Sequence, residues 1–205
     1  FGNVKAFTST LAIQGWSYSG VNLSILASDG SPTGIFFGNV GNSFYLLGAA
    51  NTRVVQYNMS TTNMANTGTV FGNVLVSGTS ASPQDLFINS TGANLYVLGQ
   101  TARTVSQHTL STPWNITTAT SASLSANISA QEATPTGLWF SSDMANMYIV
   151  GTTNDTVYQY TLTTPGNVAT ASYASKSVSV TNQDGTPTAV NLSSDGTKMW
   201  VLGQA

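Results

Sequence analysis

TPTGLWFSSDMANMYIVG, residues 134–151, contains a short apolar strand, a polar turn and a second apolar strand that ends in Gly. The same order follows each Ser-Pro or Thr-Pro pair, at Pro32, Pro83, Pro135 and Pro187, which lie 51 or 52 residues apart. Two further strand-like runs complete each full copy. A repeat of about 40 to 50 residues with several short strands is typical of a β-propeller, in which each copy forms one blade.

The pattern predicts four-stranded antiparallel blades and almost no helix, because no segment shows an apolar period of 3.6 residues. First strands are expected at 34–37, 85–88, 137–140 and 189–192, and second strands at 43–48, 94–99, 146–151 and 198–203. Third strands are expected at 53–59, 104–110, 156–162 and 3–9, and fourth strands at 69–76, 121–128, 175–181 and 20–27. The Gly that ends each second strand (Gly48, Gly99, Gly151, Gly203) is expected to supply a turn residue with positive φ.

The fourth copy is divided between the two ends of the chain. In the full copies a Val lies six residues after the terminal Gly, and the same count from Gly203, continued from residue 205 to residue 1, reaches Val4. We therefore expect one domain, residues 1–205, with repeats 31–81, 82–133 and 134–185 and a split repeat of 186–205 plus 1–30. The predicted fold is an all-β, four-bladed β-propeller closed by pairing of the N- and C-terminal strands.

Three geometries agree with this split copy. The ends can pair within one chain, which is the arrangement we expect first. They can pair between chains, head to tail, which gives a filament or a larger ring. The chain can also be a piece of a protein with more blades.

Composition excludes several classes of function. Only 6% of the residues are charged, against about 25% in typical soluble domains, and the net charge is −2. A nucleic-acid interface or an attachment to anionic lipid needs a basic patch, which five Lys and Arg do not make. The absence of Cys excludes disulfides and thiolate metal sites. High Ser, Thr and Asn content with little charge favours an extracellular, cell-surface or virion protein.

Residues 193–203, SSDGTKMWVLG, and 154–162, NDTVYQYTL, carry a family resemblance. They resemble the lactonase-like, Tyr-Val-Thr-Asn-type propeller repeats of prokaryotic surface proteins and of phage structural proteins. The resemblance covers nearly the whole chain and implies a propeller fold. The first copy departs from it, with Gly38-Asn39-Val40-Gly41 in place of the Asp-Gly turn, and such repeats more often form rings of six to eight blades.

Few residues suggest catalysis, and we expect no enzyme, no catalytic residue, no metal and no cofactor. Asp85 begins a first strand where the other copies have Gly or Ala, so it is expected near the central channel, either as a solvated residue or as a ligand for a cation or a sugar hydroxyl. His108 occupies the place of Tyr57 and Tyr160 and is expected to pack as a ring. Lactonase-type propellers hold a metal with several acidic or amide ligands in the channel, which one Asp does not provide.

Two tryptophans, Trp16 and Trp114, lie in the long loops before fourth strands and are candidate sugar-binding residues or loop anchors. Seven Asn-x-Ser/Thr sequences are candidate glycosylation sites, close to the number that composition alone predicts. They are Asn22, Asn58, Asn89, Asn115, Asn127, Asn154 and Asn191.

These observations lead to a hypothesis of a non-catalytic structural or adhesion module outside a cell or on a virion. It would associate with itself, as a filament for example, or with other surface proteins and possible glycan ligands, and would not insert into a membrane. The alternatives are a carbohydrate-binding propeller and, less favoured, a lactonase-like hydrolase.

Overall fold

The computed structural model describes residues 3–8, 17–25, 27–78, 80 and 82–204, and they form strands joined by turns and short 3₁₀ segments. The strands are β1 (Asn3–Thr8), β2 (Ser17–Ser24), β3 (Pro32–Gly38), β4 (Ser43–Gly48), β5 (Arg53–Met59), β6 (Gly68–Leu75), β7 (Pro83–Ile88), β8 (Asn94–Gly99), β9 (Thr104–Leu110), β10 (Ala119–Asn127), β11 (Pro135–Phe140), β12 (Asn146–Gly151), β13 (Thr156–Leu162), β14 (Ala171–Ser179), β15 (Pro187–Leu192) and β16 (Met199–Gly203). The 3₁₀ segments are η2 (Asn39–Gly41), η3 (Ala65–Thr67), η4 (Ile116–Thr118) and η5 (Val168–Thr170). The all-β class is therefore confirmed.

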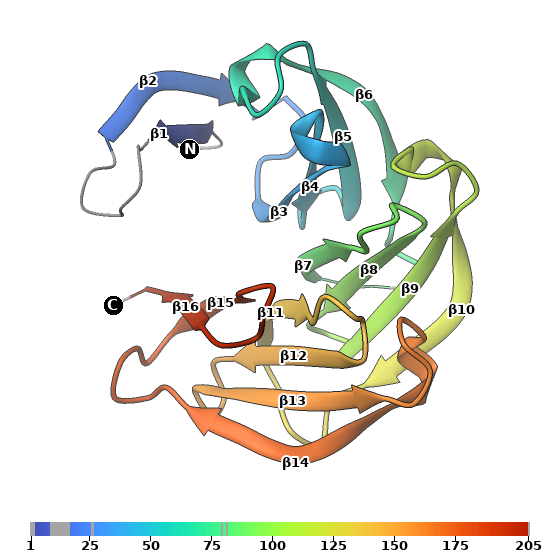
Figure 1. Cartoon of the computed structure of the whole chain (residues 1–205), viewed down its shortest axis with the longest axis vertical. Helices are drawn as coiled ribbons and strands as arrows, with labels where there is room; N and C mark the ends of the chain where they lie inside the picture. The colour runs from blue at the N-terminus through green and yellow to red at the C-terminus, as the bar shows by residue number, and fades with distance from the viewer. Residues whose placement is uncertain (1–2, 9–16, 26, 79, 81, 205) are drawn as a thin grey trace.

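Three complete blades follow one another along the chain. The first blade is β3–β6, the second is β7–β10 and the third is β11–β14, each an antiparallel sheet in sequence order. Two two-stranded sheets flank them, which we call the N-terminal half-blade (β1–β2) and the C-terminal half-blade (β15–β16). Figure 1 shows the blades as an arc with the half-blades at its two ends.

The arc is open, and this corrects the predicted closure. Within the described residues β1 pairs only with β2, and β15 pairs only with β16. The two half-blades lie on opposite sides of a gap in Figure 1. Each is half of the four-stranded pattern, because β15–β16 are a first and a second strand and β1–β2 are a third and a fourth.

Consecutive blades pack face to face through equivalent positions. Tyr45 and Leu47 of β4 point to the second blade and pack in one cluster with Leu86 and Ile88 of β7. Tyr96 and Leu98 of β8 meet Leu138 and Phe140 of β11 in the same way, and Val150 of β12 meets Val190 of β15. The second strands β4 and β8 are buried on both faces because each lies between two neighbouring sheets, which explains their continuous apolar sequence.

The glycines that end the second strands do not have positive φ, so that prediction was wrong. At Gly48, Gly151 and Gly203 a carboxylate occupies the space where a side chain would stand. A Cβ on Gly48 would lie 2.1 Å from Cγ of Asp29, and one on Gly151 would lie 2.4 Å from Cδ of Glu132. Glycine is needed here because the acidic side chain packs directly on the main chain.

Left-handed residues instead close the turns between first and second strands. Gly41, Gly92, Met144 and Gly196 have φ between 59° and 79°. Asp195, which precedes Gly196, is not among the residues with positive φ. In the β3–β4 turn Asn39 and Val40 also have positive φ. Glycine adopts this conformation without the clash that a Cβ creates.

Candidate functional site

The candidate site is a pocket of about 340 Å³ between the first and second blades. Its walls come from the β3–β4 turn, from β4–β6, and from the loop that leads into η4. The lining residues are Asn39, Asn42, Ser43, Gln56, Asn58, Met59, Phe71, Pro113, Trp114 and Asn115. Five of these ten side chains are amides and none is charged, so the pocket offers neutral hydrogen-bonding groups.

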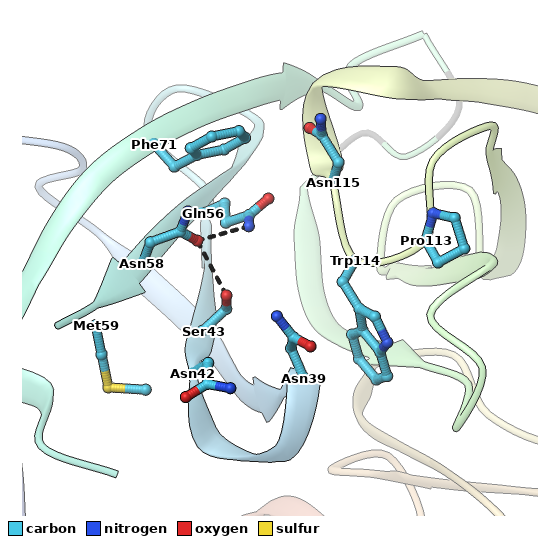
Figure 2. A pocket seen from close by; sticks show the side chains of 10 residues that line it. All are labelled: Asn39, Asn42, Ser43, Gln56, Asn58, Met59, Phe71, Pro113, Trp114 and Asn115. Atoms are coloured by element: carbon cyan, nitrogen blue, oxygen red, sulfur yellow. Dashed lines mark hydrogen bonds between the residues drawn. The ribbon is translucent and has the colours of Figure 1, made fainter. Parts of the chain in front are cut away.

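A hydrogen-bond network fixes the amides at the centre of the pocket (Figure 2). Asn58 Oδ1 accepts from Ser43 Oγ at 3.0 Å and from Gln56 Nε2 at 2.8 Å. Gln56 Oε1 in turn accepts from the backbone N–H of Ile116 at 2.9 Å. With its oxygen engaged twice, the Asn58 side chain is oriented, and its Nδ2 is left to donate to a ligand.

The loop that carries Trp114 is held against the first blade by two bonds. Tyr45 Oη donates to the carbonyl oxygen of Trp114 at 2.7 Å. Gln56 Oε1 accepts from the N–H of Ile116, which follows Trp114 by two residues. Burial raises the pKa of Tyr45 well above its ordinary value, so the phenol stays protonated and remains a donor. We call this Tyr–Gln pair the latch.

The same latch joins the second and third blades. Tyr96 Oη donates to the carbonyl oxygen of Gly166 at 2.7 Å, and the N–H of Val168 donates to Gln107 Oε1 at 3.3 Å. Gln occurs at this place in β5, β9 and β13, as Gln56, Gln107 and Gln159. This recurrence of Gln is the signal in the sequence that indicates the loop contact.

Aromatic rings bound the pocket on two sides. Figure 2 shows Phe71 and Trp114 on either side of Ser43 and Gln56. Trp114 is half-buried, and its ring lies against Gly38 and Gly92, where a Cβ would approach to 2.4 Å and 2.5 Å. Trp114 thus anchors its loop and also forms a wall of the pocket. Trp16, the other candidate, lies outside the described residues.

Asp85 lies away from this pocket, at the inner strands. Its Oδ1 accepts from the N–H of Leu86 and its Oδ2 from the N–H of Leu138, both at 2.8 Å. Part of its surface is exposed, but the carboxylate is enclosed by the inner strands, and burial raises the pKa of Asp85 to about 7. Because both oxygens bind main-chain groups, Asp85 joins β7 to β11 across two blades.

The remaining candidates do not converge on one place. His108 is buried on β9, and burial lowers its pKa. No cluster of three or more potential metal ligands of the His, Asp and Glu type occurs among the described residues. In the same part of the chain, no helix is long and apolar enough to span a membrane.

The glycosylation candidates differ in environment. Asn22, Asn127, Asn154 and Asn191 are exposed. Asn58 and Asn115 line the pocket, and Asn89 Oδ1 accepts from the N–H groups of Ala93 and Asn94. A glycan on Asn58 would replace a hydrogen-bonded pocket amide, so this position is unsuited to modification.

Solved structures match this fold at low sequence identity. A proposed 6-phosphogluconolactonase from Bacteroides uniformis has a TM-score of 0.54 at 16% identity, with 84% of this chain and 50% of that chain covered. A protein from Lactobacillus plantarum gives 0.60 at 12% identity, with coverage of 98% and 58%. Virginiamycin B lyase from Staphylococcus aureus gives 0.51 at 14% identity, with coverage of 84% and 49%.

These matches support a β-propeller fold, and the chain spans about half the length of the proteins that it matches. No sequence family and no curated protein matches it. The comparisons contradict the hypothesis of a surface or virion module: two of the matched structures are proposed 6-phosphogluconolactonases, and none of those named here is a surface or virion protein. At these identities the likeness establishes the fold alone.

Proposed function

We propose that this chain forms the ligand-recognition part of a lactonase-like propeller, and that the pocket between the first and second blades binds a neutral, hydroxyl-rich ring such as a sugar-derived lactone. The observation that carries the proposal is the pairing of oriented amides with two aromatic rings around one cavity. Hydroxyl groups exchange hydrogen bonds with amides, and the apolar face of a sugar ring packs on an aromatic side chain.

The lining favours a neutral ligand over a phosphorylated one. No Lys, Arg or His lines the pocket, so a phosphate group would lose its water without gaining a cationic partner. A lactone and its parent sugar have ring oxygens and hydroxyls that match the Asn58, Asn39 and Asn115 amides. The pocket residues hold no titratable group, so the proposal concerns recognition of the ring.

Calorimetric titration tests the proposal with three probes: freshly dissolved D-glucono-1,5-lactone, D-glucose and 6-phosphogluconate. We expect the two neutral rings to bind and the phosphorylated acid to bind more weakly. Asn58→Leu and Phe71→Ala should each weaken binding by about tenfold, which corresponds to about 1.4 kcal/mol. Asn73→Leu, on the exposed face of β6 outside the pocket, is the matched control and should bind as the unmodified chain does.

Binding that is equal in all four proteins would place the ligand elsewhere and refute this site. Absence of binding by either neutral ring would refute the ligand class. Release of acid from the lactone, followed at constant pH against buffer alone, separately measures whether the chain opens the ring.

A further inference from the structure

The third blade carries a latch on which no loop lies. Tyr148 of β12 lies opposite Gln159 of β13, which is the arrangement of the latch in the first and second blades. Gln159 Nε2 donates to Asn146 Oδ1 at 2.8 Å, and this bond orients the amide. Among the described residues, no group is hydrogen-bonded to Tyr148 Oη or to Gln159 Oε1. The donor and the acceptor that hold a loop at the other two junctions are therefore both available here.

A pocket of about 240 Å³, which we call the latch pocket, includes these two side chains. Val178 of β14 is 55% exposed, whereas Ala126, at the same place in β10, is 5% exposed. The surface that a loop covers at the second junction is thus uncovered at the third. The residues that line the latch pocket are Tyr148, Val157, Gln159, Lys176, Ser177, Val178 and Met199.

The two closed latches show what kind of segment fits this surface. The residue whose N–H donates to the Gln is Ile116 at the first junction and Val168 at the second, and each is 0% exposed. Asn115 or Asn167 precedes it, and the Asn side chain accepts from the N–H two residues later, which caps the 3₁₀ turn. The two segments read TPWNIT, 112–117, and TPGNVA, 164–169. The shared pattern is Pro-x-Asn followed by Ile or Val.

One position of the latch pocket adds a charge to this pattern. The residue opposite the latch Gln on the fourth strand is Gly72 in the first blade, where a Cβ would lie 2.3 Å from Cγ2 of Thr117. It is Leu124 in the second blade, where the loop has the smaller Ala169 after its Val. In the third blade it is Lys176, which is exposed and forms no ion pair with any described residue. A lysine here favours an acidic residue directly after the Ile or Val of the segment.

The loops of this sequence do not supply that segment. Those at 111–118 and 163–170 are held at their own junctions. The loop at 60–67 has no Pro, and its Ala65 is buried in the first blade. Residues 9–16 contain neither Pro nor Asn. We therefore look for the segment in another polypeptide.

We propose that the third blade is a docking site for another protein, which presents a turn of sequence Pro-x-Asn-(Ile/Val)-(Asp/Glu) to the latch pocket. Tyr148 donates to the carbonyl oxygen of residue x, and Gln159 accepts from the N–H of the Ile or Val. The apolar side chain fills the pocket, and the acid pairs with Lys176. The Pro and the Asn restrict the turn before it binds, which lowers the entropic cost of docking.

The probe is the capped peptide Thr-Thr-Pro-Gly-Asn-Val-Asp-Thr, which is the sequence of 163–170 with Asp in place of Ala169. It is titrated into the isotope-labelled chain and followed by NMR. We expect a Kd of about 0.1 to 1 mM, with shifts of the amide signals of 176–178 and of Met199. Absence of these shifts at about 2 mM peptide would overturn the proposal. Shifts of the same signals that grow with the concentration of the chain alone would show that a second copy covers the pocket, and the proposal would be wrong.

Two substitutions test the latch itself. Gln159→Leu should weaken peptide binding by about tenfold, because the N–H of the peptide Val loses its acceptor. Tyr148→Phe, which keeps the ring, should act in the same direction. Both side chains are partly exposed, and the NMR spectrum of each variant reports whether its fold is kept. Gln183→Leu, an exposed change of the same kind, should bind as the unmodified chain does. Equal affinity in all four proteins would place the peptide elsewhere and refute the site.

Changes in the peptide test its chemistry. Asp in place of the peptide Val should abolish binding, because it puts a charge in the apolar part of the pocket. The peptide with the original Ala should bind about twofold to threefold more weakly than the Asp peptide, the range of an exposed ion pair. Lys176→Ala should remove this difference. Equal binding of the Asp and Ala peptides to the unmodified chain would refute the preference for an acid.

Discussion

A buried acid and a glycine form one structural unit in this repeat. Glu132 is fully buried, and its Oε1 accepts from the N–H of Thr134 at 2.8 Å and from that of Thr153 at 3.1 Å. In the first blade, Asp29 Oδ1 accepts from the N–H of Ser31 and its Oδ2 accepts from the N–H of Asn51. The carboxylate thereby ties the start of a blade to the turn after its second strand, and it reaches that turn only because Gly151 or Gly48 has no side chain.

Gly151→Ala should destabilise the protein by about 1–3 kcal/mol, the usual cost of overpacking. The new Cβ would lie 2.4 Å from Cδ of Glu132 and 2.5 Å from the carbonyl oxygen of Thr134. Gly185→Ala is the control, because nothing lies within 4 Å of its Cβ position. Urea unfolding measures both, and equal stability of the two variants would contradict the packing argument.

Asp85 should make stability depend on pH between about 4 and 7. Burial raises its pKa from 3.8 to about 7, so in this range the folded chain holds a proton that the unfolded chain has released. The free energy of unfolding should therefore fall as the pH rises from about 4 to about 7, by at most about 1.4 kcal/mol per pH unit, and be level above pH 7.

Urea unfolding at several pH values, with Asp85→Asn as the control, checks this slope. The Asn variant should lose this slope, and its stability should be closest to that of the unmodified chain at low pH, because the protonated acid and the amide each have one carbonyl acceptor. Asp143 and Asp195, whose pKa values are lowered by hydrogen bonds from Ser141 and Ser193, contribute the opposite slope below about pH 4, outside this window. A slope that persists in the variant would assign it to another group.

At the scale of elements, the loop before each fourth strand is the part that binds the preceding blade. The loop of the second blade reaches the first blade through the latch of Tyr45 and Gln56, and it brings Trp114 to the pocket. The pocket is therefore a by-product of blade docking, and its shape depends on a loop that belongs to the neighbouring sheet.

Gln56→Leu should destabilise the protein by about 1–3 kcal/mol, because it leaves the buried N–H of Ile116 without its acceptor. It should also weaken binding of a neutral ring in the pocket, since Asn58 loses the partner that orients it. Gln183→Leu, an exposed change of the same kind, is the control. Thermal unfolding and calorimetric titration measure the two effects, and a stable Gln56→Leu variant would show that the latch is dispensable.

The second and third strands of the three complete blades were predicted to the residue, because the Pro and Gly positions recur with every copy. The fourth strands were predicted less well: the strand expected at 175–181 is β14, Ala171–Ser179. The predicted strand at 43–48 is β4, and that at 156–162 is β13. Trp114 was found among the pocket residues because aromatic residues in loops are conspicuous. Asn39, Ser43 and Phe71 were missed, because they come from η2, β4 and β6 of the first blade and line a pocket only where the loop of the second blade docks, which nothing in their local sequence indicates.

The prediction of positive φ at Gly48 and Gly151 was wrong because it also depended on contacts that the local sequence does not show. A glycine can be required for either of two reasons: the backbone is left-handed, or another group packs closely against it. The sequence alone does not show which reason applies. The acid lies three residues before each blade-opening Pro in three of the four copies, as Asp29, Glu132 and Asp184, and that spacing was the usable signal.

At the scale of the whole molecule, stability comes from packing of apolar faces between blades, with very little charge. Twelve acidic and basic residues in 205, with a net charge of −2, leave few long-range electrostatic interactions. Strand pairing and blade docking are both contacts between neighbouring segments of the repeat, so each junction is stabilised locally.

Salt should therefore change stability little. Raising NaCl from about 0.05 to about 0.5 M screens surface charges, and we expect the free energy of unfolding to shift by less than about 1 kcal/mol. Urea unfolding at the two concentrations, at one pH and one protein concentration, checks this. A larger shift would reveal a charge interaction that the low charge content does not suggest.

The latch has a direction, since the first and second blades each offer a Tyr and a Gln and the blade that follows offers the loop. A duplication or deletion of one 51- or 52-residue unit, in phase, would therefore give every remaining blade a neighbour with the matching parts. Genes for such chains can gain or lose whole blades by unequal crossing-over without new compensating changes. A chain lengthened by one copy of residues 134–185 should fold with its existing junctions intact, and the curvature of the arc would then select how many copies a ring accepts.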